Sequence, residues 1–127
     1  MSDTTQPALI PLYNSKGDAD AFLFYPYLFN CNGDWVGFVN SKREVYSVLG
    51  NYVGYISNDR RILRKRATST LKSRLQPPPR PKRISPPAHS PLAPLMSELT
   101  FSIIDVLLDE PERLHTADGG EQRQDLD

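Results

Sequence analysis

Few side chains in this sequence combine the residue types and the spacing that catalysis or metal binding requires. The two histidines, His89 and His115, have no partners at the spacing of a metal site or a catalytic triad. Cys31 is the single cysteine, so no internal disulfide can form and a reducing compartment is compatible. A serine nucleophile elbow, a phosphate-binding glycine-rich loop and paired cysteines are absent. Three aspartates lie near predicted turns, where turn formation and solvation explain them: Asp18, Asp20 and Asp34. We therefore expect no catalytic, cofactor-binding or metal-binding residues, no cofactor and no enzymatic activity.

The basic side chains are the one group whose charge suggests a functional contact. The chain has no net charge, but residues 1–59, 60–83 and 84–127 carry −3, +10 and −7. A basic segment of this kind is typical of a nucleic-acid, anionic-lipid or acidic-protein partner. It is equally typical of a solvated segment, or of one that folds back on an acidic tail. The candidate anion or nucleic-acid contacts are Arg60, Arg61, Arg64, Lys65, Arg66, Lys72 and Arg74.

An internal repeat is the element that would position these side chains. Residues 12–23 align without gaps on residues 28–39 and again on residues 45–56. Gly17, Gly33 and Gly50 occupy the same place in the three copies, and Ile62 begins what could be a fourth copy that a basic run interrupts. A match this regular indicates internal duplication of one structural unit.

Each copy has the pattern of a β-hairpin, because short β-prone runs flank a turn centred on glycine. The pair Asn32 and Gly33 predicts a type I′ turn, in which both central residues have positive φ. A small residue recurs beyond the turn at Ala21, Gly37 and Gly54. Since glycine weakens a strand unless another backbone comes close, we infer close packing of neighbouring hairpins at that position.

The repeated pattern resembles that of a known family. It reads aliphatic, aromatic, Asn or Ser, two variable residues, Gly, two variable residues, Val, Gly, aromatic, aliphatic, and it recurs about every 16 residues over approximately residues 11–66. This pattern is similar to the four-fold beta flower family of small bacterial domains. The resemblance implies hairpins arranged as petals around a pseudo-four-fold axis, and it implies no known activity or catalytic residue. A rival interpretation, a fragment of the tyrosine–aspartate repeats of a large secreted shell, is disfavoured by the initial Met1 and by a polar N-terminus without a signal-peptide pattern.

The apolar material is concentrated in the repeat, and the prolines follow it. Eleven of the twelve aromatic residues lie in residues 13–55, where we interpret them as core, whereas nine of the twelve prolines lie after Arg66. Eight of the eighteen residues in 77–94 are proline, which excludes helix and predicts an extended polyproline II spacer. At about 3.1 Å per residue the spacer could reach roughly 55 Å. Pro78, Pro81 and Arg83 match the motif that aromatic grooves recognise, although such matches are frequent in proline-rich linkers.

A short amphipathic helix is predicted after the spacer, over residues 97–110. Ser102 and Asp105 resemble a capping box, and Pro111 marks a stop. One helical face is apolar and forms a candidate docking face: Leu99, Ile103, Val106 and Leu107. A free helix of two or three turns is marginal, so we expect this face to be buried, either on the chain's own β-domain or on another protein.

The sequence thus predicts an all-β fold, a small pseudo-four-fold arrangement of hairpin repeats followed by a proline-rich extended linker and one short C-terminal helix. We divide the chain into a disordered N-terminus (1–8), an autonomously folding repeat domain (9–70), a basic and proline-rich linker (71–96), the helix (97–110) and a disordered acidic tail (111–127). No apolar run is long enough to span a membrane, so a cytoplasmic protein is expected. The function expected first is a non-catalytic scaffold or protein-interaction module. The alternatives are a nucleic-acid-binding accessory protein that uses residues 60–83, and a small ligand-binding protein or enzyme with a pocket at the pseudo-axis.

Overall fold

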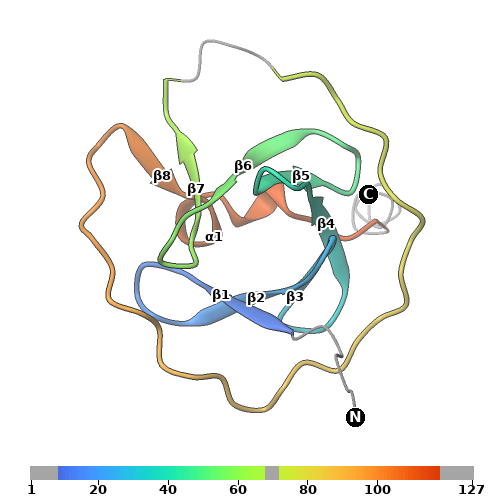
Figure 1. Ribbon diagram of the computed structural model, residues 1–127, viewed down its shortest axis with the longest axis horizontal. Helices are drawn as coiled ribbons and strands as arrows, with labels where there is room; N and C mark the ends of the chain where they lie inside the picture. The colour runs from blue at the N-terminus through green and yellow to red at the C-terminus, as the bar shows by residue number, and fades with distance from the viewer. Residues whose placement is uncertain (1–8, 68–71, 118–127) are drawn as a thin grey trace, which may run out of the picture.

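The structure, a computed structural model, describes residues 9–67 and 72–117. Its eight strands form one antiparallel sheet in which each strand pairs with the next along the chain. The strands are β1 (Ile10–Tyr13), β2 (Ala19–Phe24), β3 (Tyr27–Asn30), β4 (Trp35–Val39), β5 (Glu44–Ser47), β6 (Tyr52–Ile56), β7 (Ile62–Lys65) and β8 (Ile103–Asp105). They curl around a central axis as four hairpins (Figure 1), which confirms the predicted all-β flower.

Five turns share one construction, which explains the repeat in the sequence. They span residues 14–18, 30–34, 40–44, 47–51 and 57–61. In the second of these turns the Asn30 side-chain oxygen accepts hydrogen bonds from the amides of Asn32 and Asp34, and the Gly33 amide donates to the Asn30 carbonyl. The fourth residue of each turn has positive φ, a conformation that glycine adopts freely: Gly17, Gly33, Arg43, Gly50 and Arg60.

The type I′ turn predicted at Asn32 and Gly33 is wrong. Of these two residues only Gly33 has positive φ, at 84°, and the Asn30 amide donates to the Asp34 carbonyl across a three-residue loop. This is the hairpin geometry in which a turn is followed by one left-handed residue, and it places the Asn30 side chain where it can bond the loop amides.

The close packing inferred at the recurring small residue is confirmed at two of its three positions. A Cβ atom on Gly37 would lie 2.4 Å from the Tyr46 carbonyl oxygen, and one on Gly54 would lie 2.3 Å from the Leu63 carbonyl oxygen. The backbone of the following hairpin therefore occupies the space of a side chain. At Ala21, the equivalent position in the first copy, the methyl group is buried.

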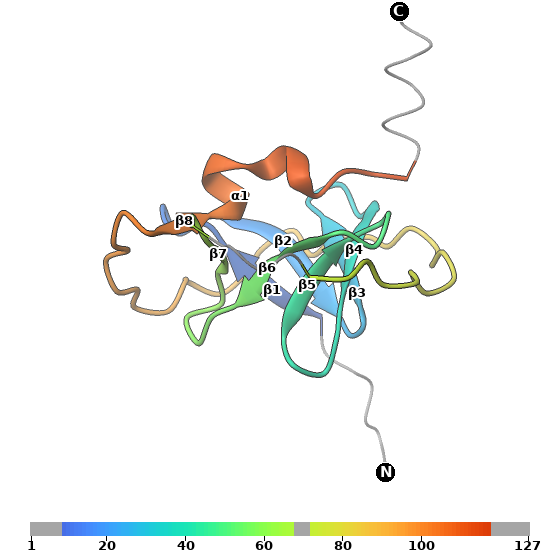
Figure 2. The ribbon, with the colours of Figure 1, turned by 90° about the horizontal axis from the view of Figure 1, so that it is seen from above.

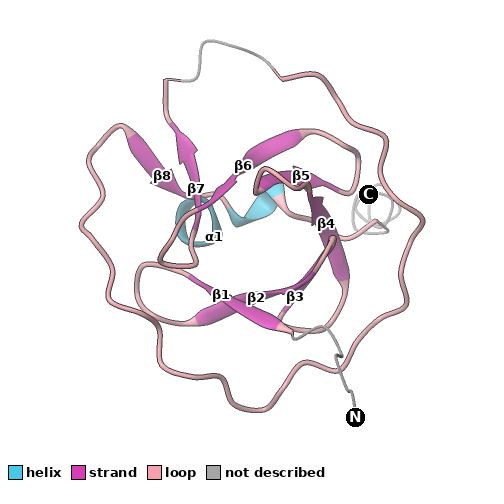
Figure 3. Ribbon diagram, in the orientation of Figure 1, coloured by secondary structure: helices cyan, strands magenta, loops and turns pink. Residues whose placement is uncertain are grey.

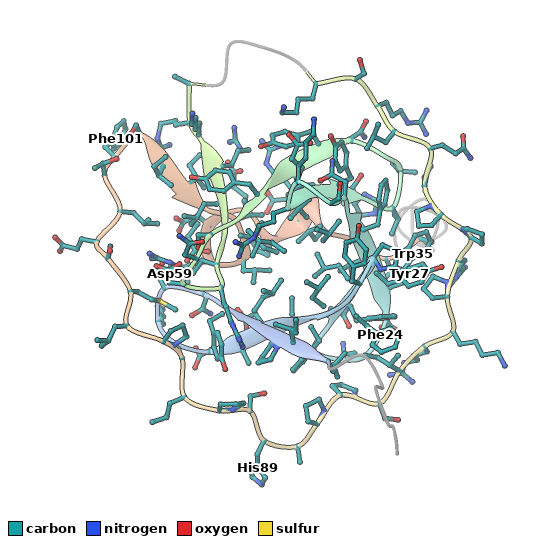
Figure 4. The ribbon with its side chains drawn as sticks, in the orientation of Figure 1. Phe24, Tyr27, Trp35, Asp59, His89 and Phe101 are labelled. Atoms are coloured by element: carbon teal, nitrogen blue, oxygen red, sulfur yellow. The ribbon has the colours of Figure 1, made fainter. Side chains whose placement is uncertain are left out.

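The core lies inside the curled sheet, and aliphatic side chains from every part of the ring meet there. Its buried members are Leu12, Ala21, Leu28, Val36, Val39, Val45, Val53, Ile56, Ile62 and Val106. A second cluster of Phe29, Trp35 and Val48 lies toward the perimeter and packs against Tyr27 and Ile84; Figure 4 shows Trp35 and Tyr27 close together on this side. Of the aromatic residues interpreted as core, Tyr13, Phe22, Phe29, Trp35, Phe38 and Tyr46 are buried.

The C-terminal segment supplies the second strand of the fourth hairpin. Strand β8 pairs with β7, with Arg64 opposite Ile104, and α1 (Val106–Asp109) and a 3-10 helix (Pro111–Arg113) follow it. The helix predicted over residues 97–110 is therefore too long, since residues 103–105 are strand. A free edge on β7 offers a whole ladder of backbone hydrogen bonds, and two β-branched isoleucines suit it better than one marginal helical turn does.

The predicted docking face is buried on the chain's own sheet, to different extents along its length. Val106 is fully buried in the core, Leu107 packs against the core partly buried, and Ile103 and Leu99 are half-buried. Figure 3 shows the helix lying near the axis, with the strands around it. The repeat domain predicted over residues 9–70 thus lacks strand β8 and the core side chains of Ile104 and Val106.

Residues 72–102 run around the outside of the flower, and we call them the belt. Figure 1 shows the belt passing the outer ends of the hairpins in nearly a full circle before it enters β8. The belt has no helix or strand, as expected for a proline-rich spacer. Of the disordered segments predicted over residues 1–8 and 111–127, residues 1–8 and 118–127 lie outside the described residues. At Pro111–Arg113 the prediction is wrong, because these residues form the 3-10 helix.

We predict that a chain ending at residue 70 does not unfold cooperatively. It leaves the β7 edge unpaired and removes Val106 from the core, where the loss of one large aliphatic side chain alone costs about 2–5 kcal/mol. Thermal unfolding followed by Trp35 fluorescence measures this. Adding a synthetic peptide of residues 97–117 should restore the transition, and a cooperative transition of the shortened chain near the temperature of the full chain would contradict the fold.

Candidate functional site

A buried polar cluster joins the last hairpin to the first. Asp105 is 2% exposed, and its Oδ2 accepts hydrogen bonds from the Ser15 amide at 2.7 Å and from the Ser15 hydroxyl at 2.5 Å. Its other oxygen accepts from the Leu108 amide and caps α1. Arg61 is also 2% exposed, and its guanidinium donates to the Ser15 hydroxyl at 2.9 Å. A carboxylate with this many donors is satisfied in the interior, so the cluster has a structural role.

Arg61 connects this cluster to the belt as well. Its Nη2 donates to Asp59 at 2.6 Å and to the Ser97 carbonyl of the belt at 2.8 Å. Burial raises the pKa of Asp59, but hydrogen bonds from Arg61 and Ser57 outweigh it, so the pKa stays below its usual value. The buried cation thus has a paired counter-ion, which a charge in this position needs.

A second ion pair fixes the end of α1 to the sheet. Two guanidinium nitrogens of Arg64 on β7 donate to the Glu110 carboxylate at 3.0 and 3.1 Å. Arg113 also donates to it, at 2.6 Å. The hydrogen bonds from Arg64 lower the pKa of Glu110, and those from Arg113 add to this, while burial acts in the opposite direction.

Most of the cations proposed as nucleic-acid contacts have partners inside the chain. Besides Arg61 and Arg64, Arg66 donates to the Phe101 carbonyl with its guanidinium 4.3 Å from the ring centre, and Arg74 donates to the Leu49 carbonyl. Lys72 pairs with Glu44 at 2.8 Å, and this hydrogen bond raises the pKa of Lys72 and lowers that of Glu44. Arg60 and Lys65 are exposed. Nucleic-acid binding by residues 60–83 stays a prediction.

The belt grips the outer turns through a motif that is used twice. Arg74 bonds the Leu49 carbonyl and the next amide, of Leu75, donates to the Gly50 carbonyl at 3.0 Å. Nine residues later Arg83 bonds the Asn32 carbonyl and the Ile84 amide donates to the Gly33 carbonyl at 3.0 Å. A Cβ atom on Gly50 would lie 2.0 Å from the Leu75 carbonyl oxygen, and one on Gly33 would lie 1.9 Å from the Ile84 carbonyl oxygen. Both distances are too short for any side chain. Glycine is thus required at these two positions for two reasons: the backbone has positive φ, and the belt leaves no space for a side chain.

The nine-residue spacing continues to the remaining petals. Ala93 lies next to Gly17, and the Tyr13 hydroxyl donates to the nearby Pro91 carbonyl at 2.7 Å. The Ser102 carbonyl then accepts from the Arg66 amide at 2.7 Å. Steps of nine residues therefore take the belt from the turn at Gly50 to those at Gly33 and Gly17, and a last step takes it to the end of β7.

The flower has one covered end and one open end. Figure 2 shows α1 on one side of the sheet and the turns β2–β3, β4–β5 and β6–β7 projecting on the other. At the open end a cavity of about 540 Å³, which we call the axial mouth, is lined by Ile10, Leu12, Leu23, Tyr25, Val39, Asn40, Ser41, Arg43, Ile56 and Arg60. The cavity has the size, the apolar lining and the few polar groups of a small-molecule site.

Sequence reasoning placed a pocket at the pseudo-axis only as an alternative and named none of the residues of the axial mouth, although two signals for them were present. Leu23, Val39 and Ile56 are the last residues of the three aligned copies, so the repeat itself brings them together at the axis. Arg43 and Arg60 occupy the turn position that is glycine in the three outer turns. Neither signal could be interpreted before the turns between the copies were known to share the construction of those within them.

Comparison with protein-family models identifies the family of this chain. The model of the 4-fold beta flower protein matches residues 10–104. The chain belongs to this family. The match extends the resemblance seen over residues 11–66 through the belt and into β8, so the belt is part of the flower. Searches of curated proteins and of solved structures give no match.

The beta flower contains no arrangement of ligands for a metal ion among its described residues. In that part of the chain no three side chains of His, Cys, Asp or Glu come together at a metal site. His89 lies on the belt and points outward in Figure 4. Cys31 is exposed at a turn. The pKa of its thiol is raised, mainly by partial burial and in addition by the negative charge of the nearby Asp20, and this disfavours the reactive thiolate. Within residues 9–67 and 72–117, no helix has the length and apolarity needed to cross a membrane.

Replacing Arg61 by alanine should lower the free energy of unfolding of the beta flower by about 3–5 kcal/mol. The substitution leaves Asp59 and the Ser15–Asp105 pair without their buried cationic partner. Arg43→Ala is the matched control, since Arg43 is exposed and its two hydrogen bonds are 3.2 Å long. Its cost should stay below about 1 kcal/mol. Urea unfolding of both variants measures the difference, and equal costs would refute the role of the cluster.

The ion pair at Glu110 predicts a dependence of stability on pH. Because its pKa is lower in the folded chain, the pair contributes fully above the unfolded pKa of about 4.3 and its contribution is lost as the pH falls through that value toward the folded pKa. Glu110→Gln should therefore make the free energy of unfolding fall less steeply with acidification. The exposed Glu112→Gln controls for the loss of one negative charge. An identical slope for Glu110→Gln and the natural chain would remove this account.

Proposed function

We propose that this beta flower is a non-catalytic protein-interaction module and that its belt presents the contact surface. The observation behind the proposal is the exposure of two belt leucines, since Leu92 is 96% and Leu95 is 99% exposed. Exposed apolar patches on a protein surface mark sites of interaction, and we interpret these two neighbouring leucines as such a patch. Two members of the C-terminal docking face predicted from the sequence, Val106 and Leu107, pack against the chain's own core, so we favour the belt as the contact surface.

The conformation of the belt supports this choice of surface. Leu92 and Leu95 are three residues apart and follow Pro91 and Pro94, so in a polyproline II conformation of three residues per turn they lie on one side. Contacts at Tyr13 and Arg61 hold the segment on both sides of them. A partner with an aromatic groove meets a surface that is already extended and restrained, which reduces the entropy lost on binding.

The same reasoning disfavours the proline motif of Pro78, Pro81 and Arg83 as the contact surface. Pro78 and Pro81 are half-buried toward the flower, and Arg83 is paired with Asp34 at 3.0 Å. A groove would have to displace these contacts before it could bind residues 78–83. The leucines of residues 91–95 need no such displacement.

Changing Leu92 and Leu95 together to serine should abolish capture of the partner and leave the melting temperature within about 2 °C, because neither side chain packs on the fold. Leu49→Ser, at a 50% exposed leucine outside the belt, is the matched control and should retain capture. The measurement is affinity capture from the native host by the natural chain and both variants, after chemical crosslinking and with or without nuclease.

Two outcomes would contradict the proposal. An unchanged set of captured proteins with the double variant would exclude the belt leucines as the contact. Loss of all capture after nuclease treatment would assign the interaction to nucleic acid and favour residues 60–83 instead.

A further inference from the structure

The axial mouth carries a second inference, independent of the belt. Its floor is apolar on all sides, since Leu23, Val39 and Ile56 come from equivalent positions of three copies and Ile10 and Leu12 complete the circle. The other end of the axis is covered by the C-terminal segment, whose Val106 is fully buried in the core. The mouth is therefore a well with one entrance and not a channel.

Two arginines stand at the entrance in a backbone conformation that arginine rarely adopts. Arg43 has φ 66° and Arg60 has φ 64°, whereas the three outer turns of the same construction have glycine there. A left-handed residue with a Cβ is unfavourable, and such residues gather at functional sites. Glycine would suit the backbone of both turns, so the arginines at these positions point to a use of their side chains.

The charge of the entrance is uncompensated. Among the described residues no carboxylate lines the cavity, while Arg43 and Arg60 both do. Arg43 is held in place by the Asn58 side chain and the Ser57 carbonyl, each at 3.2 Å, and both are neutral acceptors. Within the described part of the chain the Arg60 guanidinium has no hydrogen bond or ion pair. Two cations above an apolar well attract a molecule with an anionic head and an apolar body.

We propose that the axial mouth binds a small carboxylic acid with an unbranched apolar chain. The chain lies among Leu23, Val39 and Ile56, and the carboxylate bonds the guanidinium groups of Arg43 and Arg60, whose planar donors match it. The C-terminus of a peptide offers the same head group. It is disfavoured because its backbone N–H and C=O groups would lie against apolar walls without partners.

Titration calorimetry of the full chain with decanoate tests the proposal. We expect saturable binding, and we expect decanol, which has the same chain without the charge, to bind at least tenfold more weakly. Amide signals of Val39 and Ile56 should shift in the NMR spectrum as decanoate is added, because both residues line the mouth.

Arg43→Gly and Arg60→Gly separate binding from folding. Glycine suits both turns, so the melting temperature should not fall by more than a few degrees, while decanoate should bind about tenfold more weakly to each variant and not measurably to the double variant. Lysine at both positions keeps the charge and should retain part of the affinity.

Three results would overturn the proposal. They are the absence of saturable decanoate binding to the folded chain, equal binding of decanoate and decanol, and unchanged decanoate binding by the double glycine variant. Tighter binding of a leucine-terminated pentapeptide acid than of decanoate, abolished by amidation, would replace the free acid by a peptide C-terminus. Since none of these experiments involves Leu92 or Leu95, their failure would leave the belt proposal unaffected.

Discussion

The hydrogen bonds between Asp105 and Ser15 are the constraint on which the remaining structure depends. They join the end of β8 to the turn between β1 and β2, and hence the last petal to the first. Because Asp105 is buried, its carboxylate would destabilise the fold if these donors were missing. The formation of β8, the capping of α1 and the contact with Ser15 are therefore favourable only together. Arg61 extends the same network to Asp59 and to the belt at Ser97. A single buried cluster thereby determines where the chain leaves the belt and enters the core.

The belt explains how a segment so rich in proline can belong to a folded domain. It cannot form a helix or a central strand, yet the amides of Leu75 and Ile84, nine residues apart, bond the outer turns at Gly50 and Gly33. Because Gly50 and Gly33 lack a Cβ, the belt carbonyls of Leu75 and Ile84 approach them directly. Ile84 adds an apolar contact with the cluster around Trp35. The spacer is therefore a perimeter strap whose inner side holds the petals and whose outer side offers Leu92 and Leu95.

The sequence predicted what depends on local pattern. Gly17, Gly33 and Gly50 have the positive φ expected of turn glycines, and Gly37 and Gly54 lie under a neighbouring backbone as inferred. The pairing of β8 with β7 could not be predicted in this way, because about forty residues separate the strands and the short apolar run at Ile103 satisfies helical and strand patterns alike. The internal partners of the basic stretch were hidden for the same reason. Arg64 meets Glu110 and Arg61 meets Ser15 only after the ring has closed.

The open end of the flower shows a different limit of sequence reasoning. The turns at Arg43 and Arg60 have the construction of the glycine turns, but the residue that identifies such a turn is replaced there. A search for glycine therefore misses them, although the Asn or Ser that begins each turn was visible at Asn40 and Ser57. The same substitution that hid these turns is what makes the axial mouth basic.

Hydrogen exchange at the Ser15 amide tests the central claim most directly. Ser15 lies in an exposed turn, so without Asp105 its amide would exchange at the rate of an unstructured chain. The account predicts that this amide is protected to nearly the level of the β1 and β2 core amides, and that Asp105→Ala removes the protection. Fast exchange of Ser15 in the natural chain, with the core amides protected, would show that Asp105 does not hold the Ser15 amide and would contradict the account.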